Sequence, residues 1–64
     1  MRLISIEAVK EIINDVGVDA FYERLETLFY EEPLVFINKD GKVVFVPFDV
    51  LEIWDYLEKL KEEI

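Results

Sequence analysis

The chain has 64 residues and a formal net charge of −8 at neutral pH, from 15 acidic and 7 basic side chains. It contains no cysteine and no histidine, which excludes a disulfide framework, a thiolate metal site and catalysis by a histidine base. The excess of carboxylates argues against nucleic-acid binding, because affinity for phosphates comes from basic side chains that release counterions.

A short strand and an amphipathic helix are predicted at the amino terminus. Arg2–Ile4 has the character of a short strand that can join a sheet. Ser5 is a suitable N-cap, since its hydroxyl accepts a hydrogen bond from a free amide of the first helical turn. Apolar residues then recur at helical spacing until Gly17, a residue type that commonly ends helices. We therefore expect a helix over residues 6–16.

A second helix is predicted after two linking residues. Asp19 is its expected N-cap, and a carboxylate there also favours the positive end of the helix dipole. Its apolar face comprises Phe21, Tyr22, Leu25, Leu28 and Phe29. Tyr30 falls outside this face and is expected to be partly exposed. Pro33 ends the helix, because a proline disfavours the helical conformation of the residue before it. The two helices are expected to form a tight helical hairpin.

Residues 34–47 predict a β-hairpin with two apolar faces. A type I turn over Asn38–Gly41, with Gly41 in the left-handed conformation, fits the polar segment between the two apolar runs. Side chains alternate between the faces of a strand. Leu34 and Phe36 therefore lie opposite Val35 and Ile37, and Val43 and Phe45 lie opposite Val44 and Val46. A hairpin with one solvated face would alternate apolar with polar residues, so we expect both faces to be covered.

The final predicted helix begins with two local signals. Asp49 and Glu52 have the spacing of a capping box. Phe48 and Ile53 occupy the two positions of a hydrophobic staple, an apolar contact that sets how the chain enters a helix. The apolar face of this helix comprises Val50, Ile53, Trp54, Leu57, Leu60 and Ile64, and Leu51 and Tyr56 widen it. We expect the widened part to belong to an interface.

The predicted order of elements is β-α-α-β-β-α, an α+β fold in a single domain, residues 1–64. One layer of helices covers only one face of a three-stranded sheet. Either the three helices divide between the two faces, or a second copy of the chain covers the remaining face. We expect the second copy, and hence a homodimer. The interface is predicted to comprise Val35, Ile37, Val44, Val46, Leu51, Trp54 and Tyr56.

No pattern of catalytic or metal-binding residues is present. The chain lacks a Ser-His or Cys-His pair, a glycine-rich phosphate loop and an H-E-x-x-H motif. The adjacent carboxylates Glu31-Glu32 and Glu62-Glu63 point in different directions on a helix, so neither pair converges for acid–base catalysis. Asn38–Gly41 lacks the spacing of a calcium loop. We expect a protein that is not an enzyme and uses no cofactor and no metal.

The expected function is that of a small acidic module for protein–protein interaction or dimerisation, with itself or another protein as the partner. An alternative is an acidic inhibitor that imitates nucleic acid and binds a nucleic-acid-handling protein. Its acidic row would be Glu52, Asp55, Glu58 and Glu62, interrupted by Lys59 and Lys61. Two helices before a hairpin also suggest a winged-helix-like DNA binder, against which the charge balance counts.

The sequence shows no secretory signal and no apolar stretch near the ~20 residues that cross a bilayer. We therefore expect a soluble, cytoplasmic protein without membrane contact. Its charged residues are mainly Glu and Lys, and glutamine is absent. Such usage is typical of hyperthermophile proteins and of computational designs, so thermostability is expected with either origin.

A further pattern spans residues 1–47. Its parts are the strand Arg2–Ile4, the helix Ile6–Val16 ending in Gly17-Val18, the Phe21 to Leu25 spacing, and the run from Gly41 to Val46-Pro47. This pattern resembles the start of the ornithine cyclodeaminase/mu-crystallin family, with Val46 in place of a methionine. In that family the region belongs to the dimerisation and substrate domain. The family's hairpin arginine, downstream lysine and nucleotide-binding domain have no counterpart, so the resemblance implies a dimerisation module without cyclodeaminase activity.

Overall fold

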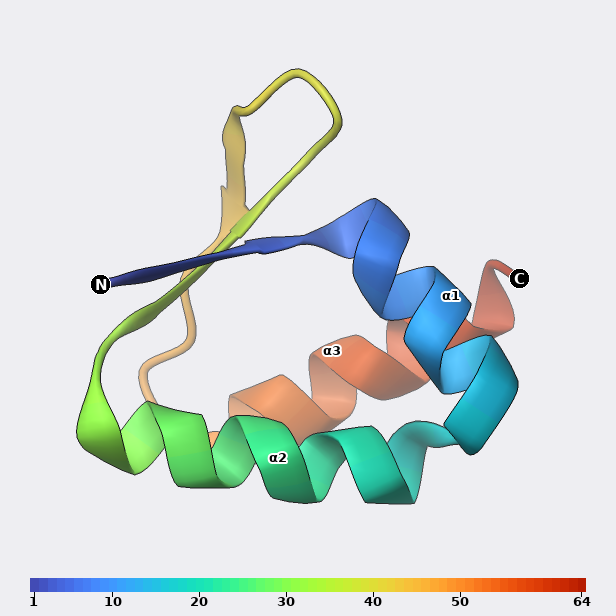
Figure 1. Ribbon diagram of the computed structural model, residues 1–64, viewed down its shortest axis with the longest axis horizontal. Coiled ribbons are helices and arrows are strands. Elements are labelled where there is room, and N and C mark those ends of the chain that lie inside the picture. The colour runs from blue at the N-terminus through green and yellow to red at the C-terminus, as the bar shows by residue number, and fades with distance from the viewer.

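The computed structural model describes all residues, 1–64, and has the predicted α+β order (Figure 1). The elements are β1 (Arg2–Ser5), α1 (Ile6–Val16), α2 (Val18–Glu31), β2 (Leu34–Ile37), β3 (Val43–Phe45) and α3 (Val50–Glu62). None of the three helices has the length and apolar content that a membrane crossing requires.

The three strands form one mixed sheet in the order β1-β2-β3. The predicted amino-terminal strand is confirmed: β1 pairs in parallel with β2, with Arg2 opposite Leu34 and Ile4 opposite Phe36. β2 pairs with β3 in antiparallel orientation. Parallel neighbours need a long crossover connection, and α1 and α2 together supply it. The central strand is therefore β2, which is also the most buried of the three.

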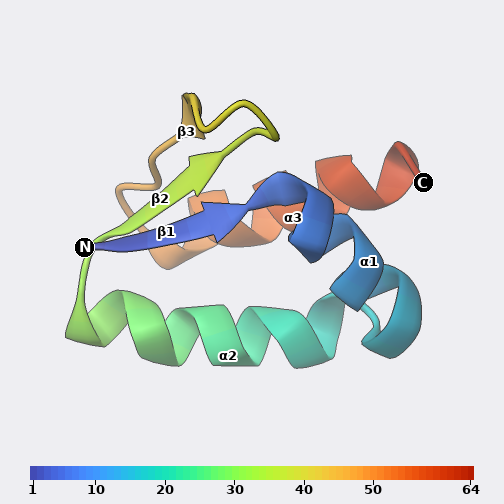
Figure 2. The ribbon, with the colours of Figure 1, turned by 45° about the horizontal axis from the view of Figure 1, so that its top comes forward.

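The helices lie on one side of this sheet. In Figures 1 and 2, α2 and α3 run beneath the strands, and α1 continues from the end of β1. The buried core joins all three helices to β2 and comprises Val9, Ile13, Val18, Phe21, Leu25, Leu34, Phe36, Ile53, Leu57 and Leu60. The helices do not divide between the two faces of the sheet, so the other face has no cover within the chain.

The boundary between α1 and α2 is tighter than expected. The Ser5 hydroxyl oxygen accepts a hydrogen bond from the Ala8 amide at 3.4 Å, and the Gly17 amide donates to the Ile13 carbonyl. Gly17 alone reverses the chain, with a φ of +92° that favours glycine. α2 therefore begins at Val18, and Asp19 lies inside its first turn. The prediction of a two-residue link with Asp19 as N-cap was wrong.

The start of α3 confirms half of the predicted capping box, because Asp49 caps the helix but the Glu52 carboxylate bonds the Phe48 amide and not the Asp49 amide. The Asp49 carboxylate accepts a hydrogen bond from the Glu52 amide at 2.9 Å, as an N-cap should. The Glu52 carboxylate accepts from the Phe48 amide, which fixes that backbone with its ring turned outward. Phe48 is 87% exposed, whereas Ile53 is fully buried. The predicted staple between Phe48 and Ile53 was therefore wrong.

The hairpin turn has the predicted conformation. The Gly41 amide donates to the Asn38 carbonyl at 3.0 Å, and the Asn38 amide donates to the Lys42 carbonyl at 2.9 Å. Gly41 has a φ of +81°, the left-handed conformation that this turn requires. The Asn38 side-chain oxygen accepts from the amides of Asp40 and Lys42. Local hydrogen bonds thus hold the turn together without contact from the helices.

A bulge in β3 changes which residues share a face. Phe45 pairs with Phe36 and Val43 pairs with Ile37, so the extra residue is Val44. Val43 therefore lies on the face of Ile37, where it is 60% exposed. The expectation that Val43 shares a face with Phe45 was wrong, because the extra residue reverses the simple alternation along the strand.

Candidate interaction surface

The side of the sheet away from the helices is a candidate interaction surface. We call it the outer face, and it comprises Leu3, Val35, Ile37, Val43 and Val44. Leu3 is the register partner of Val35, and Val43 that of Ile37, so each pair shares a face. None of the five belongs to the core cluster or to the residues packed against it. All five side chains are aliphatic hydrocarbons, and the one polar residue that the register places on this face is Ser5, opposite Ile37.

The outer face is open to solvent at its margins. Leu3 is 56% exposed on β1, and Val43 and Val44 are 60% and 44% exposed on β3. Val35 is buried because the two edge strands flank it. Soluble monomers rarely expose a contiguous apolar patch larger than a few hundred Å². The outer face is thus a surface that water solvates poorly.

The opposite face of the sheet, the inner face, packs against an aromatic side chain of α3. Phe45 stacks on Tyr56 with ring centroids 4.4 Å apart, and Phe36 meets the same ring edge-on at 5.4 Å. Burial of Tyr56, with Glu63 nearby, raises the pKa of its hydroxyl above the ordinary value. Trp54 is half-buried, in edge contact with Tyr22 of α2 at 5.1 Å. Both α3 aromatics therefore serve packing within the chain.

The structure brings only part of the predicted interface together. Val35, Ile37 and Val44 share the outer face, and Val46 follows the end of β3 with 42% exposure. Tyr56 lies beneath the inner face, so it is on the other side of the sheet. Leu51 is 70% exposed on α3 and makes no part of the outer face.

Sequence reasoning missed two residues of this surface, Leu3 and Val43. Leu3 is the middle residue of the predicted strand. Alternation along β1 sets it opposite its two neighbours but does not tell which of the two faces of the sheet it lies on. The parallel register with Val35 decides that. Val43 was assigned to the inner face because a bulge leaves no reliable signal in a run of valines.

Charge is divided sharply between the two layers. Residues 1–5 and 34–46, which build the sheet and its turn, hold three of the seven basic residues and one of the fifteen acidic ones. The helices and their connections hold the other four basic and fourteen acidic residues. No strand residue facing outward is charged. A partner on the outer face would therefore approach the side of the molecule that has the least negative charge.

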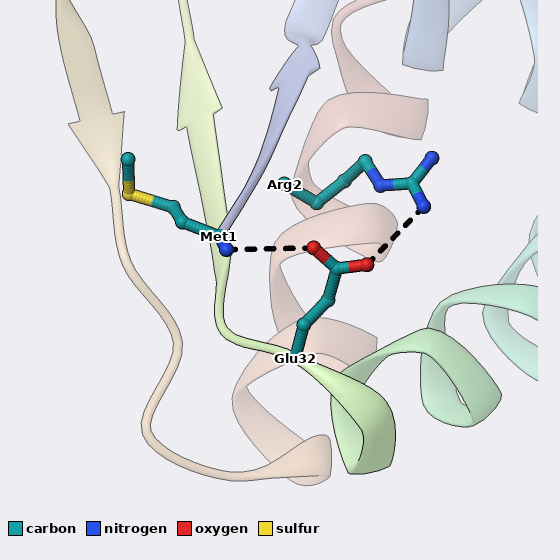
Figure 3. A network of polar contacts seen from close by, with 3 residues as sticks. All are labelled: Met1, Arg2 and Glu32. Atoms are coloured by element: carbon teal, nitrogen blue, oxygen red, sulfur yellow. Dashed lines mark hydrogen bonds and ion pairs between the residues drawn. The ribbon is translucent and has the colours of Figure 1, made fainter.

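An ion-pair network ties β1 to the end of α2. The Glu32 carboxylate lies 3.2 Å from the Arg2 guanidinium and 3.5 Å from the terminal amine of Met1 (Figure 3). The hydrogen bond from Arg2, together with the amine, holds the pKa of the Glu32 carboxyl below its usual value. Pro33 accepts a backbone hydrogen bond from Arg2 at 2.9 Å. The network thus sets the start of the parallel pairing of β1 with β2.

A groove of about 490 Å³ lies at this same end of the sheet. It runs between the connection that follows α2 and the connection that precedes α3. Its lining includes Tyr30, Glu31, Leu34, Val46 and Phe48. Tyr30 and Phe48 are 73% and 87% exposed. The groove therefore adds exposed aromatic surface beside the outer face.

No group of three or more acidic side chains is arranged to hold a metal ion. Comparisons with protein-family models, with curated proteins and with solved structures find no match for this chain. The chemistry of the candidate surface, rather than any relative, therefore carries the functional argument.

Proposed function

We propose that this chain is a small, non-catalytic protein–protein interaction module that forms a homodimer through its outer face. The observation that carries the proposal is the aliphatic outer face, which lies opposite the helices and has no cover within the chain. Removing apolar surface from water stabilises an association by about 25 cal/mol per Å². A twofold axis lets one such patch cover its own copy.

The distribution of charge supports a second copy as the partner. Two chains of net charge −8 repel each other. When the outer faces meet, however, the two acidic helical layers lie on the far sides of the assembly, so this repulsion is at its weakest. The resemblance of residues 1–47 to a dimerisation segment points in the same direction.

The sheet alone does not supply a full interface. Three strands about 4.8 Å apart and about four residues long give roughly 190 Å² of flat sheet, whereas stable interfaces bury about 800 Å² per partner. The accessible surface of the chain is 4359 Å², so such an interface would cover about a fifth of it. The proposed dimer therefore needs contacts at the ends of the sheet as well.

Sedimentation velocity between about 1 and 200 µM tests the proposal. We expect a species of twice the 7.6 kDa chain mass to accumulate with concentration. Val44→Lys places a charge on the β3 side of the outer face and should shift the equilibrium to monomers. Val16→Lys is the matched control, because Val16 is similarly exposed, at 53%, but lies on α1. A monomeric unsubstituted chain throughout this range would refute the proposal.

The alternative, an acidic inhibitor of a nucleic-acid-handling protein, has one observation in its favour. Fourteen of the fifteen acidic residues lie in the helices and their connections, which concentrates negative charge in one layer. Binding of this kind weakens steeply with added salt, whereas apolar association through the outer face does not. The salt dependence of binding to any captured partner therefore separates the two functions.

A further inference from the structure

The two ends of the hairpin carry opposite free charges. Lys39 and Lys42 lie at the turn, are exposed, and form no ion pair within the chain. Asp40 lies between them and is also exposed and unpaired, so the turn keeps one net positive charge. Figure 1 shows this turn projecting away from the connections that follow α2 and precede α3. At the opposite end lies Glu31, which is also exposed and unpaired. Its neighbour Glu32 is already paired with Arg2.

The groove at the acidic end has features that suit a basic turn. Two of its nine lining residues are the carboxylates Glu31 and Glu32, and none is basic. Val46 links the groove to the outer face, because it lines the groove and directly follows β3, the last strand of the sheet. Phe48 presents an exposed ring there, against which the hydrocarbon stem of a lysine can pack. The groove is thus an extension of the proposed interface.

We propose that the two copies associate with their hairpins antiparallel, so that the turn of each copy lies at the acidic groove of the other. This inference rests on the proposed homodimer. A twofold axis across the strands brings Lys39 and Lys42 to Glu31 of the partner copy, twice in one dimer. An axis along the strands would instead set turn beside turn, where the lysines of both copies outnumber the Asp40 carboxylates, and Glu31 beside Glu31, so both ends would gather net like charge. The antiparallel arrangement also supplies the contacts beyond the sheet that a stable interface needs.

A charge-swap experiment tests the orientation. Lys42→Glu and Glu31→Lys should each weaken the dimer about three- to tenfold at low salt, because each places like charges opposite one another at both ends. The double variant Lys42→Glu/Glu31→Lys should recover the original dissociation constant to within about twofold. These differences should shrink near 0.5 M salt, since the charges are exposed. All of these side chains are exposed, so the variants should fold.

Glu31→Lys separates this inference from general repulsion. It reduces the net negative charge by two units, so a mere net-charge effect would tighten the dimer rather than weaken it. Glu11→Lys makes the same change on the exposed surface of α1 and should leave the dimer unchanged or tighter. Additive effects in the double variant, or a tighter dimer with Glu31→Lys, would overturn the antiparallel orientation while leaving the homodimer standing. A monomeric unsubstituted chain would overturn both.

Discussion

The two faces of the sheet have nearly the same apolar character and opposite environments. On the inner face, Leu34 and Phe36 are 1% and 0% exposed beneath the helices. On the outer face, Val35 of the central strand is 8% exposed, but Leu3 and Val43 on the edge strands are more than half exposed. Apolar composition is therefore not what distinguishes a core face from an interface in this chain. The difference lies in which side of the strands the three helices pack against (Figure 2).

The largest expected effect comes from the inner face. Phe36→Ala removes a fully buried ring that packs against both Phe45 and Tyr56, and such truncations cost about 3–5 kcal/mol. A small domain has a total stability near the lower end of about 5–15 kcal/mol, so we expect a largely unfolded chain. The fraction of folded chain is measured by circular dichroism during a urea titration.

Leu3→Ala on the outer face is the matched comparison for Phe36→Ala. Because Leu3 is 56% exposed, its truncation should cost the monomer less than about 1 kcal/mol. Both variants should be measured well below the concentration at which the chain associates. Equal losses of stability would mean that both faces are covered within one chain.

An effect smaller than that of Phe36→Ala is expected at the entrance to α3, the helix that covers the inner face. Asp49→Ala removes the carboxylate that accepts from the Glu52 amide, and loss of an N-cap costs about 1 kcal/mol, within a range of about 0.5–2. Asp49→Ser keeps an acceptor at this position and should recover most of the loss. Both changes are measured from the midpoint of thermal unfolding. No difference between the two variants would show that the cap does not stabilise the helix.

Phe48→Ser should change the stability of the monomer by less than about 0.5 kcal/mol, because its ring is 87% exposed and forms no staple. Ile53→Ala, at the other staple position, should cost about 2–5 kcal/mol, since Ile53 is fully buried. Chemical unfolding of the two variants side by side gives this contrast. A loss of stability above about 1 kcal/mol for Phe48→Ser would show that Phe48 does form a staple contact with Ile53.

The smallest effect concerns the ion pair at the start of the parallel pairing. Arg2→Ala should raise the pKa of the Glu32 carboxyl toward its usual value, because Arg2 is the main cause of the lowered pKa. In the unsubstituted chain, the stability from this contact is present above the unfolded pKa and is lost as the pH falls through the folded pKa. Carbon-13 NMR titration of the carboxyl measures the change. Lys10→Ala, which breaks the separate pair with Glu63, should leave the Glu32 pKa where it is.

Local sequence was sufficient for the elements and most of their ends. Ser5 and Asp49 cap their helices, and Gly41 takes the left-handed conformation of the turn. The helix over residues 6–16 has the predicted bounds. These features depend on hydrogen bonds or steric limits within about four residues, so the sequence pattern contains the information they need.

Tertiary structure decided what depends on neighbours distant in the sequence. The register of β1 with β2 places Leu3 beside Val35, and the bulge in β3 turns Val43 outward. The packing of α3 turns Tyr56 toward Phe36 and Phe45, away from the surface where it was expected. The sequence alone determined that apolar residues fill both faces of the hairpin. Only the packing decided which face the helices cover. A run of Val, Ile and Phe places apolar side chains on both faces of a strand, so the sequence does not distinguish the covered face from the exposed one.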